Sequence, residues 1–395
     1  AALLAGQLIP DHGLLTTHSL TTGEAIMIML LVQGLLAAAL AGAQARRQAL
    51  VRVCTAMDKA EHVAAQREAL LLEARAELSR ALKVGGPGRH SDQVIGSFKL
   101  GNVIGRGAMG EIYEAISKDG QTAAAVKLLH RHVADSDHHI KRFMREAEAA
   151  ARLDSDHVVK LLEVGFAGKA PYMIMERLHG HDLGFYLRSR RRLSLDQVTE
   201  LVRQVGAGLE AARTAGIVHR DIKPQNIFWA ERRDQPRLWK ILDFGVSKLA
   251  DSTGTLTRGK VVGTPGYMAP EQAQGHPVDY RCDLFSLGII VYRALTGAPP
   301  FSGKDIASVL HQVVFSMPRA PSALVELPDD IDRVLAIALA KDPADRFTSG
   351  GGLADALSAV AHSQLADDLS ARADAILAKH PWDSELSRSA SSPSG

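Results

Sequence analysis

The first distinct hydrophobic pattern along the chain is an unbroken apolar segment near its start. Residues 25–43 contain no charged side chain, and Gln33 is the one strongly polar residue among them. As a helix, the segment would be about 28 Å long at about 1.5 Å per residue, close to the hydrocarbon thickness of a bilayer. Three arginines follow between positions 46 and 52, whereas residues 11–24 contain no Lys or Arg. The positive-inside rule therefore predicts a transmembrane helix over residues 25–45, with its C-terminal side in the cytoplasm.

The residues before this helix are also apolar at their start. Residues 1–9 resemble the end of an earlier membrane helix, which a short outside loop within residues 1–24 would join to the next one. That pattern would make the chain part of a longer, multi-pass protein. Two alternatives exist for residues 25–43. A signal peptide would carry its basic residues before the apolar run, and a buried Ala-rich core helix would have the same composition.

A seven-residue repeat follows over residues 46–84. One series is Leu50, Met57, Ala64, Leu71 and Leu78, and the other is Val53, Ala60, Arg67, Ala74 and Ala81. Apolar residues in both series predict a juxtamembrane helix with a coiled-coil seam, although the small Ala side chains and Arg67 weaken it. We therefore predict a weak homodimer; a single amphipathic helix against the membrane or the following domain is the alternative. The sequence GGPG ends the helix and opens a flexible linker over residues 85–97.

From residue 98 the pattern becomes that of a folded α+β domain. Short β-like runs come first, at residues 98–105, 122–129 and 170–176. A helical stretch, 136–153, lies among them, and longer helical patterns dominate after residue 195. The last residues, 387–395, are Ser-rich and polar, which is typical of a disordered tail.

Composition narrows the classes of function. The 395 residues include 46 Lys and Arg against 44 Asp and Glu, a net charge of +2, so the basic excess of a nucleic-acid-binding protein is missing. Apolar residues make up 46% of the chain, enough to bury a sizeable core. Cys54 and Cys282 are far apart and lack CxxC spacing. This argues against a disulfide scaffold or a zinc module and favours a reducing compartment.

The first chemical motif is a glycine-rich loop between two β-like runs. Residues 105–110 read GRGAMG, with Gly105, Gly107 and Gly110 at the spacing of a phosphate-binding loop. Glycine lets a backbone approach phosphate oxygens and offer them N–H groups. Dinucleotide-binding folds share this spacing, but their loop opens a helix, whereas here the β-like run 111–117 follows.

A lysine and a glutamate are the next candidates. Lys127 lies in a β-like run after the loop and can reach nucleotide phosphates if an anion holds its ammonium group in place. A solvated lysine at a strand end is the alternative. Glu146, in the helical stretch, is the expected partner, because Glu148 lies two residues further on and points to a different face.

The strongest motif is the sequence HRDIKPQN at 219–226. It places the carboxylate of Asp221, the ammonium of Lys223 and the amide of Asn226 within six residues. Such a set can accept a hydroxyl proton, offset the charge of a transferring phosphoryl group and ligate Mg²⁺. A second carboxylate for the metal, Asp243, follows a β-like run in the sequence DFG, and the sequence GTPGYMAPE closes the segment.

In this order and spacing, the motifs resemble the protein kinase family over about residues 98–347. Together with the membrane segment, they resemble bacterial receptor-type serine/threonine kinases of the eukaryotic-like class. The resemblance implies a bilobal fold over residues 98–350, with a small β-rich lobe and a larger helical lobe, followed by a helical extension and tail over 351–395. It also implies a kinase domain on the cytoplasmic side of the inner membrane. There it would use ATP with Mg²⁺ or Mn²⁺ to phosphorylate Ser and Thr of protein substrates in signal transduction.

The resemblance assigns roles in nucleotide binding. The phosphates would be covered by the loop glycines, Gly105, Gly107 and Gly110. Lys127 would bind the α- and β-phosphates and pair with Glu146. Met175 would be the gatekeeper, and the hinge from Glu176 to Leu178 would read adenine through its backbone.

The resemblance also assigns the catalytic roles. Asp221 would be the base that accepts the proton of the acceptor hydroxyl, with Lys223 near the γ-phosphate. The metal ions would be held by Asn226 and Asp243. Two structural contacts are implied as well: Asp283 would brace the backbone of the catalytic loop, and Arg346 would pair with Glu271.

Specificity and regulation follow from the same resemblance. Lys223 followed by a proline resembles serine/threonine kinases, and tyrosine kinases commonly carry other residues there. Arg220, directly before the base, resembles the arginine that grips an activation-loop phosphate in many kinases. Thr255 and Thr257 precede Thr264 at a spacing that resembles the phosphosites of bacterial relatives, so they are the predicted sites of autophosphorylation.

Two other classes of protein share part of the pattern. A pseudokinase would bind without chemistry, but it usually lacks the lysine, the base or the metal aspartate, all of which are present here. A small-molecule kinase shares the base and the metal ligands but generally lacks an activation segment ending in Ala-Pro-Glu, which this chain has at 269–271.

Two basic clusters are predicted to be solvated. A histidine cluster contains His130, His132, His138 and His139, with metal binding as the alternative. A basic run contains Arg188, Arg190, Arg191 and Arg192, with docking of an acidic substrate as the alternative.

Overall fold

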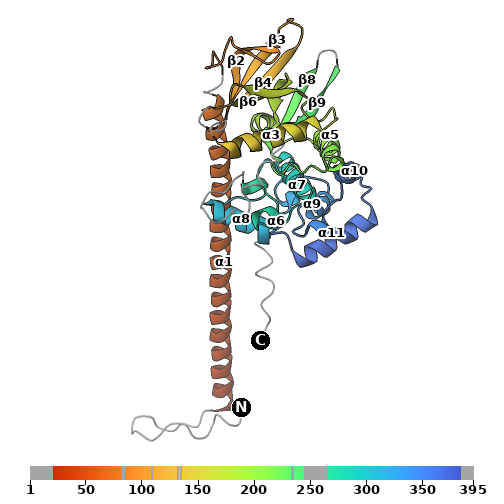
Figure 1. Ribbon diagram of the computed structural model, residues 1–395. Helices are drawn as coiled ribbons and strands as arrows, with labels where there is room; N and C mark the ends of the chain where they lie inside the picture. Colours follow the sequence, from red (N-terminus) through yellow and green to blue (C-terminus); the bar gives the residue numbers. More distant parts are fainter. Residues whose placement is uncertain are drawn as a thin grey trace. The chain divides into compact units, whose positions relative to one another are not determined.

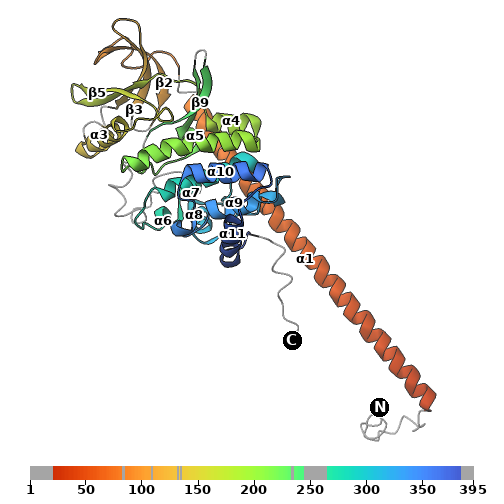
Figure 2. The same cartoon turned by 90° about the vertical axis from the view of Figure 1, so that its right-hand side faces the viewer.

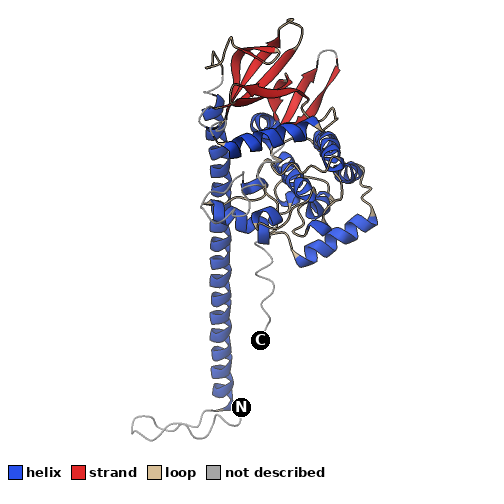
Figure 3. Ribbon diagram, viewed as in Figure 1, coloured by secondary structure: helices blue, strands red, loops and turns tan. Residues whose placement is uncertain are grey.

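The computed structural model describes residues 21–81, 85–107, 110–130, 133, 136–232, 235–243 and 265–383. The chain divides into two compact units, residues 1–61 and 62–395, and each is described by itself. Strands gather in one part of the second unit and helices in the other, so the predicted α+β fold is confirmed (Figure 3).

The N-terminal helix, α1 (Thr22–Ala81), runs for 60 residues without a break. The sequence predicts two segments here, a membrane helix to residue 45 and a juxtamembrane helix after it. The structure joins them, because no Gly or Pro lies between residues 43 and 81 and the intervening residues favour helix. Ile26–Leu50 is long and apolar enough to cross a membrane, and its side chains are exposed.

The small lobe is a six-stranded antiparallel sheet with α3 (Asp137–Ala151) beside it (Figure 1). Its strands are β1 (Val94–Ile95), β2 (Phe98–Arg106), β3 (Gly110–Ser117), β4 (Ala123–Leu129), β5 (Leu161–Ala167) and β6 (Ala170–Glu176). The strand order β1-β2-β3-β4-β6-β5 places β4 between β3 and β6. The three predicted β-like runs correspond to β2, β4 and β6, and the predicted helical stretch to α3.

Alternation along these strands builds the core of the small lobe. Leu100, Val103, Tyr113, Val126 and Ile174 are buried together on one face of the sheet. Because successive side chains of a strand point to opposite faces, the neighbours of these residues face the other side. Lys127 follows Val126 and therefore lies on the face opposite this core, paired in register with Met173 of β6.

The large lobe is mainly helical. Its helices are α4 (Leu183–Arg190), α5 (Leu195–Thr214), α6 (Pro270–Ala273), α7 (Arg281–Thr296), α8 (Ile306–Phe315), α9 (Ile331–Ala338), α10 (Gly350–Ala361) and α11 (Asp367–Lys379). A three-stranded antiparallel sheet joins them, with β7 (His179–Asp182), β8 (Ile227–Arg232) and β9 (Gln235–Ile241). Short 3-10 turns occur at Pro224–Asn226, Pro265–Tyr267, Pro321–Ala323 and Pro343–Asp345. Residues 282–296 of α7 are all buried, so this helix forms the centre of the lobe.

Helices α5 and α10 lie side by side in both views (Figures 1 and 2). Two glycines permit their close approach. A Cβ atom on Gly206 would lie 2.8 Å from the Cα atom of Gly350, and one on Gly350 would lie 2.3 Å from the Cα atom of Gly206. Glycine usually destabilises a helix interior, by about 1 kcal/mol relative to Ala. Here it allows the two backbones to touch.

The residues after position 350 continue the same lobe. Leu353 and Leu357 of α10 belong to its buried core. The next helix, α11, packs on α9, where Arg333 Nε lies 3.1 Å from Asp374 Oδ1. The predicted boundary at residue 350 therefore falls at the first residue of a helix that is packed into the large lobe.

Candidate active site

Three segments of the chain meet at the ammonium group of Lys127. Its Nζ atom lies 2.8 Å from Glu146 Oε1 on α3 and 3.0 Å from Asp243 Oδ1, which follows β9. The contact expected between Lys127 and Glu146 is therefore present. Glu148, two residues further along α3, is exposed.

The two carboxylates control the charge of Lys127. Burial alone would lower the pKa of Lys127, but the nearby carboxylates of Asp243 and Glu146 outweigh it and raise the pKa above its usual value. The lysine is therefore charged at neutral pH. A charged lysine on this face of the sheet suits an anionic ligand.

The loop after α5 holds the residues of the predicted catalytic set. Lys223 Nζ lies 2.8 Å from Asp221 Oδ2. The amide nitrogen of Asn226 donates to the carbonyl oxygen of Asp221 at 2.8 Å and to Asp221 Oδ2 at 3.2 Å. The structure thus places the side chains of Lys223 and Asn226 around the carboxylate of Asp221.

A buried aspartate holds the backbone of this loop. Asp283, on α7, accepts hydrogen bonds from the backbone N–H groups of His219 at 2.8 Å and Arg220 at 2.7 Å. The expected contact between Asp283 and the catalytic loop is therefore present. Arg220 and Asp243 have positive φ angles of 65° and 33°, and such strained residues persist only where surrounding contacts hold them.

His219 links the catalytic loop to the segment that carries Asp243, a role that the sequence analysis did not assign. Its Nδ1 atom accepts from the N–H group of Asp221 at 3.2 Å, so its Nε2 atom carries the proton and donates to the carbonyl oxygen of Leu242 at 3.0 Å. The buried imidazole therefore ties the two carboxylate-bearing segments together. Complete burial of a histidine next to charged residues is a signal that only the structure provides.

The three glycines of the loop differ in how far neighbouring atoms exclude a side chain at their positions. A Cβ atom on Gly110 would lie 1.9 Å from the carbonyl oxygen of Leu128, so packing against β4 demands glycine there. A Cβ atom on Gly107 would meet only the carbonyl oxygen of Gly110, at 3.8 Å. Gly105 is intermediate, with Ile112 at 3.3 Å. No packing contact in the described residues demands glycine at 107, which leaves open space for a ligand.

The hinge residues lie at the end of β6. Met175 is buried, and the N–H group of Glu176 donates to the carbonyl oxygen of Lys160 at 3.0 Å. The N–H group of Glu176 is therefore already used within the chain. The Arg177 guanidinium donates to the carbonyl oxygen of Leu178 at 2.5 Å.

An ion pair that the sequence analysis did not predict joins the hinge to β9. Lys240 Nζ lies 2.6 Å from Glu176 Oε1, and the lysine side chain is only 9% exposed. Lys240 precedes Asp243 by three residues, so the pair connects the hinge strand to the segment that carries the predicted metal ligand. The available signal was a lysine between apolar residues, in the sequence LWKIL at 238–242, because a buried charge needs a partner.

A second buried ion pair anchors the end of the activation segment. Both Nη atoms of Arg346 lie 2.7 Å from the two carboxylate oxygens of Glu271, and the arginine side chain is fully buried. The Arg346 side chain also donates to the carbonyl oxygens of Ala340, Arg281 and Lys341. The expected contact between Arg346 and Glu271 is present.

Replacing Glu271 by Ala leaves the Arg346 charge buried without its carboxylate. We expect the free energy of unfolding to fall by about 3–5 kcal/mol. Urea denaturation followed by tryptophan fluorescence measures this change. Glu326→Ala removes an exposed glutamate and serves as the control; an equal loss in both variants would contradict the role of the pair.

Arg220 carries buried donors that are unused within the described residues. Its Nε and Nη1 atoms are buried and have no hydrogen-bond partner there. Burial lowers the pKa of Arg220 because it removes solvent from the charged guanidinium, and an anion beside the group would offset this loss. The predicted phosphosites Thr255 and Thr257 lie outside the described residues, as do Thr264 and the last two residues of the DFG sequence.

The small β lobe, the helical lobe and the charged residues between them are the architecture of a protein kinase. A model of the protein kinase domain matches residues 98–363, and the chain therefore belongs to this family. The match extends through α10, past the predicted boundary at residue 350.

The chain is similar to bacterial serine/threonine kinases. Pkn1 of Myxococcus xanthus is 38% identical over 264 residues, which cover 66% of this chain and 38% of that protein. PknA of Mycobacterium tuberculosis is 34% identical over 270 residues, which cover 67% of this chain and 61% of that protein. The aligned part thus spans less than two thirds of the length of either relative.

A solved structure shows the same fold. The crystal structure of the Mycobacterium tuberculosis PknI kinase domain superimposes with a TM-score of 0.56 and 27% sequence identity. It covers 69% of this chain and 100% of the PknI domain. The match therefore extends over the whole PknI domain.

Proposed function

We propose that the protein is a serine/threonine protein kinase that transfers the γ-phosphoryl group of ATP to hydroxyl groups of proteins. The observation that carries the proposal is the contact of Lys223 and Asn226 with the Asp221 carboxylate, at 2.8 and 3.2 Å, together with a lysine, Lys127, that two carboxylates hold. A pseudokinase does not need this set, since binding alone requires no base.

The site suits ATP and a divalent cation. Asn226 uses its amide nitrogen in both contacts with Asp221, which leaves its amide oxygen for a cation. That oxygen and the carboxylate of Asp243 are the hard donors that Mg²⁺ and Mn²⁺ prefer. Open space at Gly107 and the charge of Lys127 suit the phosphates. When bound, ATP supplies the γ-phosphoryl group and the cation offsets its negative charge.

The residues of this chain have distinct parts in the reaction. Asp221 accepts the proton of the acceptor hydroxyl while that oxygen forms its bond to phosphorus and ADP leaves. Lys223 and Asn226 orient the Asp221 carboxylate through their contacts at 2.8 and 3.2 Å. Lys127, positioned by Glu146, binds the phosphates. Lys223 followed by Pro224 supports Ser and Thr as acceptors.

The direct test is phosphorylation by the purified chain. The full chain in detergent is incubated with labelled ATP, a generic protein substrate and either Mg²⁺ or Mn²⁺. We expect phosphate on Ser and Thr of the substrate, identified by mass spectrometry. Phosphate on Tyr alone would contradict the proposed acceptor class, and transfer to aminoglycosides but not to protein would favour a small-molecule kinase.

We propose that α1 anchors the kinase in the inner membrane with the kinase domain in the cytoplasm. The support is the length, composition and exposure of Ile26–Leu50 together with the three arginines near its end. Membrane fractionation tests this. Release of the full chain by high salt, without detergent, would contradict it.

The exposed apolar stripe of α1 supports a weak homodimer. Leu50, Met57 and Leu71 are 65%, 66% and 51% exposed, at seven- and fourteen-residue spacing. We expect a concentration-dependent dimer in sedimentation of the full chain in detergent, because pairing would bury this stripe. Leu71→Asp should weaken the dimer about tenfold, whereas Glu68→Asp should not. A strict monomer at high micromolar concentration would contradict the proposed homodimer.

We propose that phosphorylation of Thr255 and Thr257 activates the kinase through Arg220. The support is the pair of buried Arg220 donors, which a phosphate with a charge of about −2 could use. After dephosphorylation, preincubation with ATP should raise the activity of the wild type but not that of Thr255→Ala/Thr257→Ala. The control is Ser252→Ala/Thr253→Ala in the same segment. If Thr255→Ala/Thr257→Ala keeps the ATP-dependent gain in activity and Ser252→Ala/Thr253→Ala loses it, the regulatory phosphosites are Ser252 and Thr253.

A further inference from the structure

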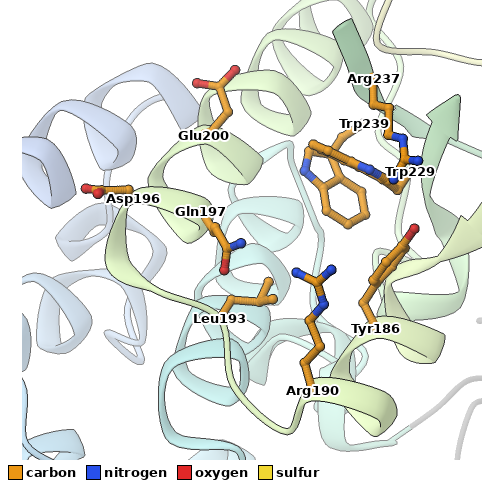
Figure 4. Close-up of a pocket in the computed structure, with 9 residues that line it drawn as sticks. All are labelled: Tyr186, Arg190, Leu193, Asp196, Gln197, Glu200, Trp229, Arg237 and Trp239. Carbon is orange, nitrogen blue, oxygen red and sulfur yellow. The ribbon is translucent and has the colours of Figure 1, made fainter. Parts of the chain in front are cut away.

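A cavity of about 380 Å³ opens on the large lobe between α4, α5 and the β8–β9 hairpin (Figure 4). None of the residues described in the candidate active site line it. Its volume falls in the range of small-molecule sites, about 300–1,000 Å³. The cavity is therefore separate from the proposed ATP site and large enough for a ligand of its own.

Aromatic rings form one wall of the cavity. The ring centroids of Trp229 and Trp239 are 4.4 Å apart, and the ring of Tyr186 meets that of Trp239 edge-on at 6.0 Å. Figure 4 shows these three rings on one side, with Leu193 and Gln197 on the other. Trp229 and Tyr186 are partly exposed, so the cavity offers an apolar surface to solvent. A flat apolar ring would fit against it.

Several charged residues at the rim are already paired. Glu200 accepts from Arg203 at 2.8 Å and from Gln204 at 2.6 Å. Arg237 lies 3.0 Å from Glu231. These residues line or flank the cavity, but their charges are balanced.

The Arg190 side chain gives the cavity a positive charge that no neighbouring carboxylate in the described part of the chain balances. Its guanidinium carbon lies 5.7 Å from the centre of the Tyr186 ring, and Figure 4 shows the group pointing into the cavity. Within the described residues no carboxylate pairs with it, and the carboxylate of Asp196 points away from the cavity in Figure 4. Aromatic walls alone would suit a cation, but Arg190 would repel one.

We propose that this cavity binds a small, flat aromatic acid. The ring packs between the two tryptophans and Leu193, and the acid group accepts hydrogen bonds from the Arg190 guanidinium. One member of the basic run at 188–192 is thereby a ligand-binding residue.

The test uses 2-naphthoate and its neutral analogue, 2-naphthamide, titrated into the full chain in detergent by isothermal calorimetry. We expect saturable binding of 2-naphthoate at least about tenfold tighter than that of the amide, because a charge-assisted hydrogen bond to Arg190 is lost with the charge. Saturating ATP should leave the dissociation constant of 2-naphthoate unchanged. Displacement by ATP, or equal binding of acid and amide, would overturn the proposal.

Variants locate the site. Arg190→Gln should weaken 2-naphthoate binding to the level of the amide, whereas Arg192→Gln, an equal charge change at an exposed residue outside the cavity, should not. Trp229→Ala should weaken both ligands. If Arg190→Gln and Arg192→Gln weaken 2-naphthoate binding equally, the proposed site is wrong. Binding of a ligand to the detergent micelle is the same in every variant, so it cancels when variants are compared. The assay needs no catalysis. A negative result would therefore leave the proposed kinase function unaffected.

Discussion

Replacing Asp221 by Asn lowers the rate of phosphoryl transfer by about 10²–10⁴-fold, the usual contribution of a general base. An amide cannot accept the hydroxyl proton. Its oxygen can still accept from Lys223, which lies 2.8 Å from the carboxylate, so the loop should keep its conformation. We therefore expect the affinity for ATP, measured by calorimetry, to change little while turnover falls.

The matched control for this prediction is Asp329→Asn, which removes the charge of an exposed aspartate. That variant should keep wild-type turnover. If Asp221→Asn also keeps it, Asp221 is not the base. If instead ATP affinity falls together with turnover, the aspartate serves nucleotide binding as well as proton transfer.

Replacing Lys127 by Met removes the cation that Glu146 and Asp243 share. We expect turnover to fall by about 10²–10³-fold, the usual cost of one preorganised charged donor. ATP binding should weaken too, because the phosphates lose their lysine. The two carboxylates, 2.8 and 3.0 Å from the lysine in the wild type, would then lack their common partner. Calorimetry with ATP and steady-state kinetics measure the two effects.

Lys169→Met is the control, because Lys169 is exposed in the turn between β5 and β6. Glu146→Gln provides a second comparison. If the pair acts as a unit, the double variant Lys127→Met/Glu146→Gln should be no slower than Lys127→Met alone. Additive losses would show that the two residues act independently.

Much of the small lobe could be predicted from local sequence. Alternating apolar residues at the start of 98–105 predict β2, because one face of that strand must pack on the core, whereas the continuous apolar run over 170–176 predicts β6, which is buried on both faces. The membrane and juxtamembrane segments were predicted as two helices, and the structure has one. The change of composition at residue 45 marks a change of environment. A helix, however, ends where Gly or Pro interrupts the backbone, and neither residue occurs there.

The pairing of distant residues was predictable only where the motifs resemble a known family. The contact of Glu271 with Arg346, 75 residues apart, was expected on that ground. The ion pair of Lys240 with Glu176, which are 64 residues apart, was not expected, because no motif of the family marks it. Local patterns specify which face of a strand is buried, but not which strand end a buried lysine will meet.

The sequence by itself determined the residue types that carry the chemistry, since Asp221, Lys223 and Asn226 lie on one short loop and their spacing along the chain limits their separation in space. Tertiary structure alone decided the crossing of α5 and α10 at Gly206 and Gly350, and the cavity between the β8–β9 hairpin and α4. These features arise where elements far apart in the chain pack together. Their geometry depends on side-chain volumes and backbone approach over the whole lobe, which no local pattern contains.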